Sequence, residues 1–264
     1  MGIDNDTTML TLDEWLPCSD VWTLAGELQT FCDDRKLHLY AAACLRRVWP
    51  LLRNESARLA VEVGEQYADG LASRDALYDA WTNAEWDMAE GLWLGRRDTG
   101  SCDCPICRER DRALGEETTS SRVHAASEED FDLWHIMCRV RHAERDIGWT
   151  TAQVVLHARR LSREREESLA QYDLAREILD DKSPLPRIDP SWLTWHDATV
   201  GRLAKAVYRE RTMPSGAFDP VRLSILADAL EEAGCTEPTI LGHLRSPGPH
   251  VRGCWTLDIL AGKR

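Results

Sequence analysis

The stretch RKLHLYAAACLRRVWPLL, residues 35–52, decides the fold class, because its apolar residues recur at the spacing of one helix face. These residues are Leu37, Tyr40, Ala41, Cys44, Leu45 and Val48. Pro50 cannot continue a helix, since it lacks the backbone N–H and its ring clashes with the preceding turn. The stretch therefore predicts one amphipathic helix that ends close to Pro50.

The same periodicity continues along most of the chain. Asn54 and Ser73 stand where N-caps are expected for the next two helices, and Asp219-Pro220 is typical of a later helix start. No pair of segments has the alternation of two strands. We therefore predict an all-α protein, either an irregular helical bundle or a short α-solenoid of helix–turn–helix units, with a cysteine-containing loop insertion.

Residues 180–192, DDKSPLPRIDPSW, contain three prolines and predict a break in the helical pattern. They separate a predicted acidic helical domain, residues 1–182 with a cysteine loop at 95–126, from a smaller helical domain, residues 187–264. Asp197 is predicted to cap the first helix of that smaller domain.

The charge and the chain start bear on compartment and partners. The formal net charge is −13, and all of the acidic excess lies before residue 187. Such a surface repels phosphate backbones and disfavours nucleic-acid binding. The first residues lack the pattern of a secretory signal, and no apolar run is long enough to span a bilayer. We expect a cytoplasmic protein whose nine cysteines are reduced or bound to metal.

Five stretches, of which the first and the last are quoted next, carry a resemblance to a known group of proteins. DEWLPCSD (residues 13–20) and LSILADALEEAGCTEPTILGHLRSPGPHVRGCWTLDILAGK (residues 223–263) resemble a family of uncharacterised helical proteins abundant in planctomycete bacteria. The resemblance covers residues 10–75 and 165–264, and residues 95–140 depart from it. RLSILADALEEAG, residues 222–234, is also similar to a planctomycete repeat-companion domain. The resemblance implies a helical architecture and no particular chemistry.

The first candidate site lies in GSCDCPICRER, residues 100–110. Its CPIC segment has the two-residue spacing that lets two thiolates reach one zinc ion. A second pair, three residues apart on one predicted helix face, supplies the remaining ligands. The predicted ligands of this structural zinc are Cys102, Cys104, Cys107, His135 and Cys138, with Cys102 as ligand or bystander. The competing interpretation is that His135 and Cys138 face the core of that helix.

The second candidate site is a group near the C-terminus: Cys235, His243, His250 and Cys254. It could be a Cys/His metal site, or a nucleophile–base pair of Cys254 and His250 at the start of the last helix, where the dipole lowers an imidazole pKa. Packing of the terminal helix is the third interpretation, in which Arg252 pairs with an acid such as Asp228 or Glu232. We favour packing, because no orienting residue or oxyanion loop can be named.

These observations lead to one preferred function and two alternatives. A helical scaffold rich in tryptophan, without a complete catalytic set, predicts a non-enzymatic protein-interaction, adaptor or regulatory protein with a structural zinc. Its expected partner is another protein. The first alternative is a Cys/His- or metal-dependent enzyme with a site near residues 235–254. The second is a zinc-containing nucleic-acid-associated factor, which the acidic charge opposes.

Overall fold

Helices dominate the chain in the computed structural model, which describes residues 28, 33–96, 151, 154–155, 158, 164–178 and 186–263. In the helix α5 (Arg74–Arg96), the side chains are described only as far as residue 87. The helices are α3 (Asp34–Arg47), η1 (Trp49–Leu51), α4 (Glu55–Ala68), α5 (Arg74–Arg96), α9 (Glu164–Ile178), α10 (Pro190–Arg209), α11 (Pro220–Glu232), α12 (Pro238–Leu244) and α13 (Trp255–Ala261). The all-α prediction is confirmed. No helix in this part of the chain is long and apolar enough to cross a membrane.

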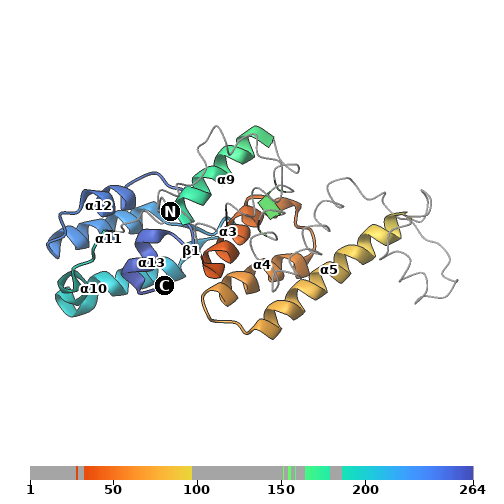
Figure 1. Ribbon diagram of the computed structural model, residues 1–264, viewed down its shortest axis with the longest axis horizontal. Coiled ribbons are helices and arrows are strands. Elements are labelled where there is room, and N and C mark those ends of the chain that lie inside the picture. Colours follow the sequence, from red (N-terminus) through yellow and green to blue (C-terminus); the bar gives the residue numbers. More distant parts are fainter. Residues whose placement is uncertain are drawn as a thin grey trace, which may run out of the picture.

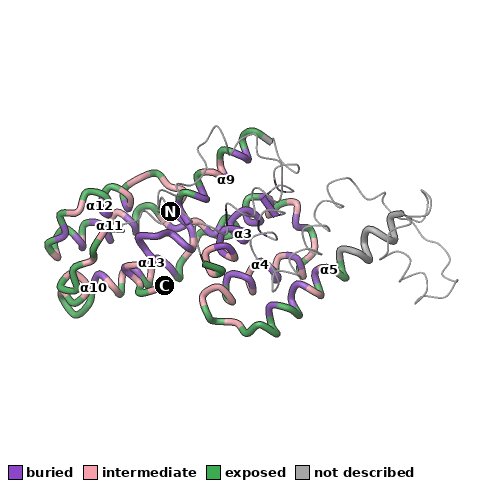
Figure 2. The backbone as a smooth tube through the Cα atoms, viewed as in Figure 1, coloured by how far each residue is buried: buried purple, intermediate pink, exposed green. Residues whose placement is uncertain are grey.

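The stretch around residues 35–52 folds as its pattern predicts. Asp33 caps α3 by accepting a hydrogen bond from the Lys36 backbone N–H, and the helix ends before Pro50, which lies in the short turn η1. Helix α3 packs against α4 and α9, and α4 packs against α5. Their buried apolar side chains form the first hydrophobic cluster. Figure 2 marks buried residues in purple along α3 and on parts of α4 and α9.

The C-terminal helices build a second hydrophobic cluster of their own. Helix α10 packs against α11 and α13, and α11 packs against α12. Asp219 caps α11 as predicted, accepting a hydrogen bond from the Val221 backbone N–H. A short antiparallel pair, β1 (Arg211–Thr212) and β2 (Ala217–Phe218), joins α10 to α11 and was not predicted. Two-residue strands are too short to show an alternating pattern.

The predicted cap at Asp197 is wrong. Helix α10 begins earlier, at Pro190, and its N-cap is Asp189, which accepts a hydrogen bond from the Ser191 backbone N–H at 2.8 Å. Proline fits the first helical position because its missing N–H would have no helical partner there. Asp197 instead lies in a kink, with a φ of 57°.

One loop, residues 246–254, lies between the two hydrophobic clusters. Figure 1 shows α10–α13 at one end of an elongated molecule and α3–α5 toward the other, with α9 above them. The loop leads into α13, yet Val251 packs in the first cluster. Gly253 lies against Ile178 and Leu39 of that cluster with a φ of +91°. We call this loop the seam loop.

The close approach at Gly253 predicts a large effect of a single methyl group. A Cβ atom there would lie 2.8 Å from Ile178 Cγ2, so Gly253→Ala combines a left-handed backbone with a steric clash. We expect a loss of about 2–4 kcal/mol in the free energy of unfolding, measured by urea denaturation. Gly262→Ala is the matched control, since the φ of Gly262 is +69° and a Cβ atom added there would meet no described atom within 4 Å beyond its chain neighbours. Equal losses in the two variants would contradict the close packing of the seam loop.

Buried ion pairs also connect α3 and α4 of the first half, which holds the first cluster, with the C-terminal half, which holds the second. Glu65 on α4 accepts paired hydrogen bonds from Arg46 at 2.6 and 2.9 Å and from Arg211 of β1 at 2.8 and 2.9 Å. Asp69, just after α4, accepts hydrogen bonds from Arg35 and from the Tyr208 hydroxyl of α10. Paired arginine–carboxylate contacts are among the stronger polar interactions in proteins. The elements that surround Glu65 and Asp69 therefore hold one another in register.

These carboxylates predict a loss of stability in acid. Burial by itself raises the pKa of Glu65, but the hydrogen bonds and charges of Arg46 and Arg211 hold that pKa below its usual value. The pKa of Asp69 is likewise lowered, by Lys263 and Arg35 against the opposing effect of burial. A lowered pKa contributes stability that is present above the ordinary carboxyl value and is lost as pH falls through the folded-state value. We therefore expect the free energy of unfolding to fall steeply below about pH 4.5.

Urea denaturation at a series of pH values measures this dependence. Glu65→Gln should flatten the curve below about pH 4.5, whereas Glu232→Gln, at an exposed position of α11, should leave its slope unchanged. An unchanged acid slope in Glu65→Gln would contradict the assignment.

Candidate metal centre

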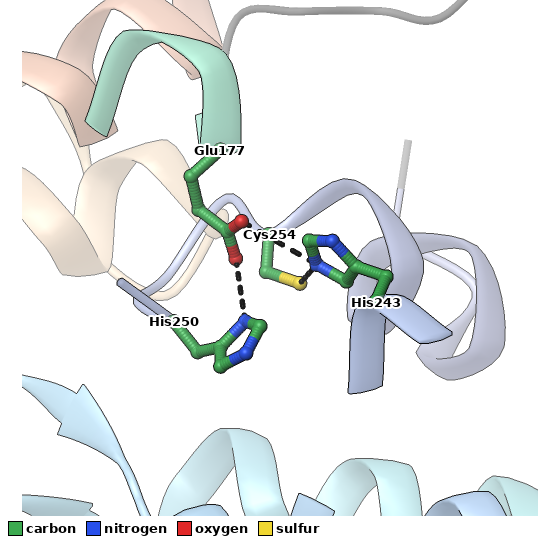
Figure 3. A group of neighbouring side chains, drawn as sticks. All are labelled: Glu177, His243, His250 and Cys254. Carbon is green, nitrogen blue, oxygen red and sulfur yellow. Dashed lines mark hydrogen bonds and ion pairs between the residues drawn. The ribbon is translucent and has the colours of Figure 1, made fainter. Parts of the chain in front are cut away.

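Four side chains that are distant in the sequence converge where the seam loop meets α9. They are Glu177, His243, His250 and Cys254, and each offers one ligand atom within 4.8 Å of the others. Figure 3 shows the Glu177 carboxylate between the two imidazole rings, with the Cys254 sulfur beside His243. We call these four residues the buried ligand group.

Four different elements of the chain position the four members of the group. Glu177 stands in the last turn of α9, His243 in the last turn of α12, and Cys254 is the N-cap residue of α13. His250 lies in the seam loop, where its carbonyl oxygen accepts a hydrogen bond from the Phe218 backbone N–H at 2.8 Å. Gly248 permits this geometry, because a Cβ atom at that position would lie 2.9 Å from the backbone nitrogen of His250.

Three separations within the group are close to those between ligands of one zinc ion. His243 Nε2 lies 3.3 Å from Cys254 Sγ and 3.4 Å from Glu177 Oε2, and His250 Nδ1 lies 3.1 Å from Glu177 Oε1. Zinc bond lengths at tetrahedral angles place nitrogen and oxygen ligands about 3.3 Å apart and nitrogen and sulfur ligands about 3.6 Å apart. The ligand atoms of the four residues all lie within 4.8 Å of one another, so small side-chain shifts would bring them around one ion.

The second nitrogen of His250 has its own partner. His250 Nε2 lies 3.1 Å from the Ser246 carbonyl oxygen and 3.2 Å from the Ser246 hydroxyl. A carbonyl oxygen can only accept, so Nε2 donates its proton to Ser246 and Nδ1 faces the group. Metal-binding histidines commonly donate their other N–H to a backbone carbonyl, which fixes the ring and its tautomer. His250 has this arrangement.

Charge in the group depends on its burial and on the neighbouring rings. Burial by itself raises the pKa of Glu177, but hydrogen bonds and charges from His243 and His250 hold that pKa below its usual value. Burial would lower the pKa of His250, yet Glu177 raises it above its ordinary value. Burial and the nearby Glu177 charge raise the pKa of the Cys254 thiol well above its usual value. A thiolate at this position therefore needs a cation beside it.

The group is closed to solvent. The side chains of Glu177 and His250 are 5% and 2% exposed, Cys254 is fully buried, and His243 is 15% exposed. A catalytic zinc normally keeps one coordination position open for water or substrate, whereas a structural zinc has four protein ligands. Four protein ligands, three of them buried and His243 partly exposed, fit the structural class.

The structure brings three residues of the predicted C-terminal group together and leaves one out. Cys235 is buried within the second hydrophobic cluster, and the fourth ligand position is taken by Glu177. The predicted pair of Cys254 with His250 is wrong, because His250 bonds Glu177 and Ser246 while His243 contacts the sulfur. His250 also lies before α13, and its pKa is raised where a decrease was predicted.

The predicted partners of Arg252 are also wrong. Arg252 points toward Glu65 and Asp69 of the first half, each at 3.8 Å, and not toward α11. A different arginine, Arg245, pairs with Asp228 and with Glu231. The seam loop turns Arg252 away from α11, an orientation that the spacing along the sequence does not encode.

Glu177 was missed because it belongs to a helix that reads as highly charged. Its position nevertheless carries a signal: it lies three residues after the buried Leu174 and next to the buried Ile178. A carboxylate in the last turn of a helix is also disfavoured by the helix dipole. An acid that is both on the apolar stripe and at the negative helix end indicates a specific partner.

The predicted zinc ligands of the cysteine loop cannot be compared with this geometry. Cys102, Cys104, Cys107, His135 and Cys138 all lie outside the described residues. The zinc site at residues 102–138 therefore stays a prediction.

Comparison with known proteins adds no relative. No family model, curated protein or solved structure matches the chain. The resemblance to helical proteins of planctomycetes therefore stays a prediction as well.

Proposed function

We propose that the chain is a non-enzymatic protein-interaction module in which one structural zinc ion joins the two hydrophobic clusters. The observation that carries this proposal is the buried ligand group, with Glu177 from α9, which packs in the first cluster through Leu174 and Ile178, and three ligands from the C-terminal part. A metal ion bound by all four would link α9 to α12 and to the seam loop. Binding to the folded chain alone would stabilise that arrangement by mass action.

The donor set supports zinc over other metals. A thiolate with two imidazoles suits zinc or copper, whereas calcium and magnesium take oxygen ligands. One carboxylate oxygen completes a tetrahedral set, and zinc in structural sites is almost always four-coordinate. Zinc has no redox chemistry of its own, which fits a role in holding helices together.

The burial of the group supports a non-enzymatic role over the metal-dependent enzyme near residues 235–254. Substrate would have to reach a position beside Cys254, which is fully buried. The raised pKa of this thiol also makes it a poor nucleophile.

Exposed apolar side chains on α4 and α5 support an interaction surface. Leu59 on α4 is 52% exposed, and Tyr78 and Trp86 on α5 are 47% and 61% exposed. Large aromatic residues contribute much of the binding energy in protein interfaces. We propose that another protein docks on this side of the α4–α5 hairpin.

Metal analysis of the purified chain tests the zinc ion at the buried ligand group. The Cys104→Ser variant removes the contribution of the predicted cysteine loop and should retain one zinc ion per chain. Adding Cys254→Ser should abolish this remaining zinc, whereas adding Cys235→Ser, at a buried cysteine outside the group, should retain it. Equal zinc in the two double variants would contradict the proposal.

Photo-crosslinking tests the interaction surface. A photoreactive amino acid at Trp86 should capture a partner protein in native lysate, and one at the exposed Lys205 of α10 should not. The interaction is contradicted if position 86 captures neither another protein nor a second copy of the chain.

A further inference from the structure

A partly buried cluster of charges between the two halves holds more cations than carboxylates among the described residues. Ion pairs connect six cations (Arg35, Lys36, Arg46, Arg211, Arg252 and Lys263) with three carboxylates (Glu65, Asp69 and Asp258). Counted over the residues that the structure describes, the cluster therefore has a formal excess of three positive charges, in a chain whose net charge is −13. Buried charge without a counter-ion is costly, so this excess calls for an anion.

Arg252 is the cation whose hydrogen bonds are missing. Each of the other five lies within 2.9 Å of a carboxylate oxygen. Arg252 reaches Glu65 and Asp69 only at 3.8 Å, and its buried Nε faces Asp69 Oδ2, with neither atom hydrogen-bonded in the described part of the chain. A small shift toward Asp69 would satisfy Nε alone. The outer N–H groups of the guanidinium would still have no acceptor within hydrogen-bonding distance among the described residues, and the excess of positive charge would be unchanged.

The surroundings of Arg252 are also cationic. Its guanidinium lies 5.6 Å from the ring centroid of Tyr208, and the Lys263 ammonium lies 4.3 Å from the same ring. Arg211 shares Glu65 with Arg252. Burial and the charge of Arg211 both lower the pKa of Arg252, as expected for a guanidinium with too little negative charge nearby. Arg252 and Lys263 keep 14% and 27% of their side chains exposed, so a small ion can reach them.

We infer that Arg252, flanked by Arg211 and Lys263, binds an oxyanion of the phosphate class. The planar guanidinium matches two oxygens of a phosphate group, and a lysine adds a point charge beside it. A dianion offsets more of the triple charge excess than a single carboxylate does. This inference goes beyond the zinc-dependent module proposed above, because none of its residues belongs to the buried ligand group.

Titration with inorganic phosphate, followed by thermal unfolding, tests the site. Phosphate should raise the Tm of the full chain more than chloride at equal ionic strength. Arg252→Gln should weaken the apparent affinity for phosphate at least tenfold, and Lys263→Gln should weaken it several-fold. Arg245→Gln is the control, since that arginine pairs with Asp228 and Glu231 at the surface. The inference is overturned if phosphate and chloride act alike, or if Lys263→Gln and Arg252→Gln both bind as the wild type does.

A parallel titration distinguishes free phosphate from a phosphorylated protein. A phosphoserine peptide that binds tenfold or more tightly than inorganic phosphate would identify a phosphoprotein as the source. Equal affinities would identify the free ion. Because Lys263 keeps 27% of its side chain exposed, its variant keeps the test valid if Arg252→Gln does not fold. Zinc content is measured in every variant, so failure of this site is distinguishable from failure of the zinc proposal.

Discussion

Removal of the bound metal by a strong chelator is expected to lower the stability of the full chain by about 4 kcal/mol, as for an ion present at about a thousand times its Kd. For a chain of this size, the Tm should fall on the order of 10 °C. The reason is that Glu177 lies on α9, which packs in the first cluster, while His243, His250 and Cys254 lie in the C-terminal part, so the ion contributes only when the two are packed together. Thermal unfolding with and without chelator, followed by zinc addition, measures this difference.

The control for this result is the comparison of two buried cysteines. Cys254→Ala should be less stable and should no longer respond to chelator or to zinc. Cys235→Ala removes a thiol of similar burial outside the group, so its response should equal that of the wild type. Each variant is compared with itself under two conditions, which cancels the packing cost of the lost sulfur. A full chelator response in Cys254→Ala would contradict the metal centre. All of these chains also carry Cys104→Ser, which excludes a contribution from the predicted cysteine loop.

Substitution of Glu65 by glutamine is expected to cost about 3–5 kcal/mol in the free energy of unfolding near pH 7. The change is almost isosteric, but it removes the negative charge between Arg46 and Arg211, whose side chains are 2% and 10% exposed. Two buried guanidinium groups would then lack their counter-ion, and desolvated charge is much more costly than a lost surface contact. Urea denaturation of the variant and the wild type measures the change.

A surface carboxylate provides the matched comparison. Glu231 on α11 also accepts two hydrogen bonds from one arginine, Arg245, at the protein surface. Because solvent and salt screen such a pair, Glu231→Gln should change stability far less than Glu65→Gln does. Similar losses in the two variants would show that burial of the Glu65 ion pairs does not increase their effect on the free energy of unfolding. An Arg46→Met and Glu65→Leu double variant should recover much of the loss, since it leaves less buried charge unpaired.

The helical architecture follows from local patterns that the sequence displays directly. The apolar spacing from Leu37 to Val48, the stop at Pro50 and the cap at Asp219 each involve residues within a few turns of one another. Helix formation depends on such neighbours, so these features could be read without the tertiary structure. The start of α10 was misplaced because a proline can either end a helix or occupy its first turn, and the choice depends on local geometry at Asp189.

The candidate site was predicted only in part, for a related reason. His243, His250 and Cys254 could be named because they lie within one short C-terminal stretch and are residue types that bind metals. Their arrangement could not be derived, since the direction of each side chain depends on the turn before α13 and on the packing of the seam loop. Cys235 has the right chemistry and a similar position in the sequence, yet its side chain is buried with the apolar residues of the second cluster.

The sequence by itself therefore determined the fold class and the helix spacing, and it named His243, His250 and Cys254 as candidates without choosing a metal site over packing. Only the tertiary structure decided that Glu177, 73 residues before His250, is the fourth member of the buried ligand group, and that Arg252 faces Glu65 and Asp69. The physical reason is the range of the interactions. Helices form through contacts between near neighbours, whereas a ligand group or an ion pair between two halves exists only after distant helices have packed together.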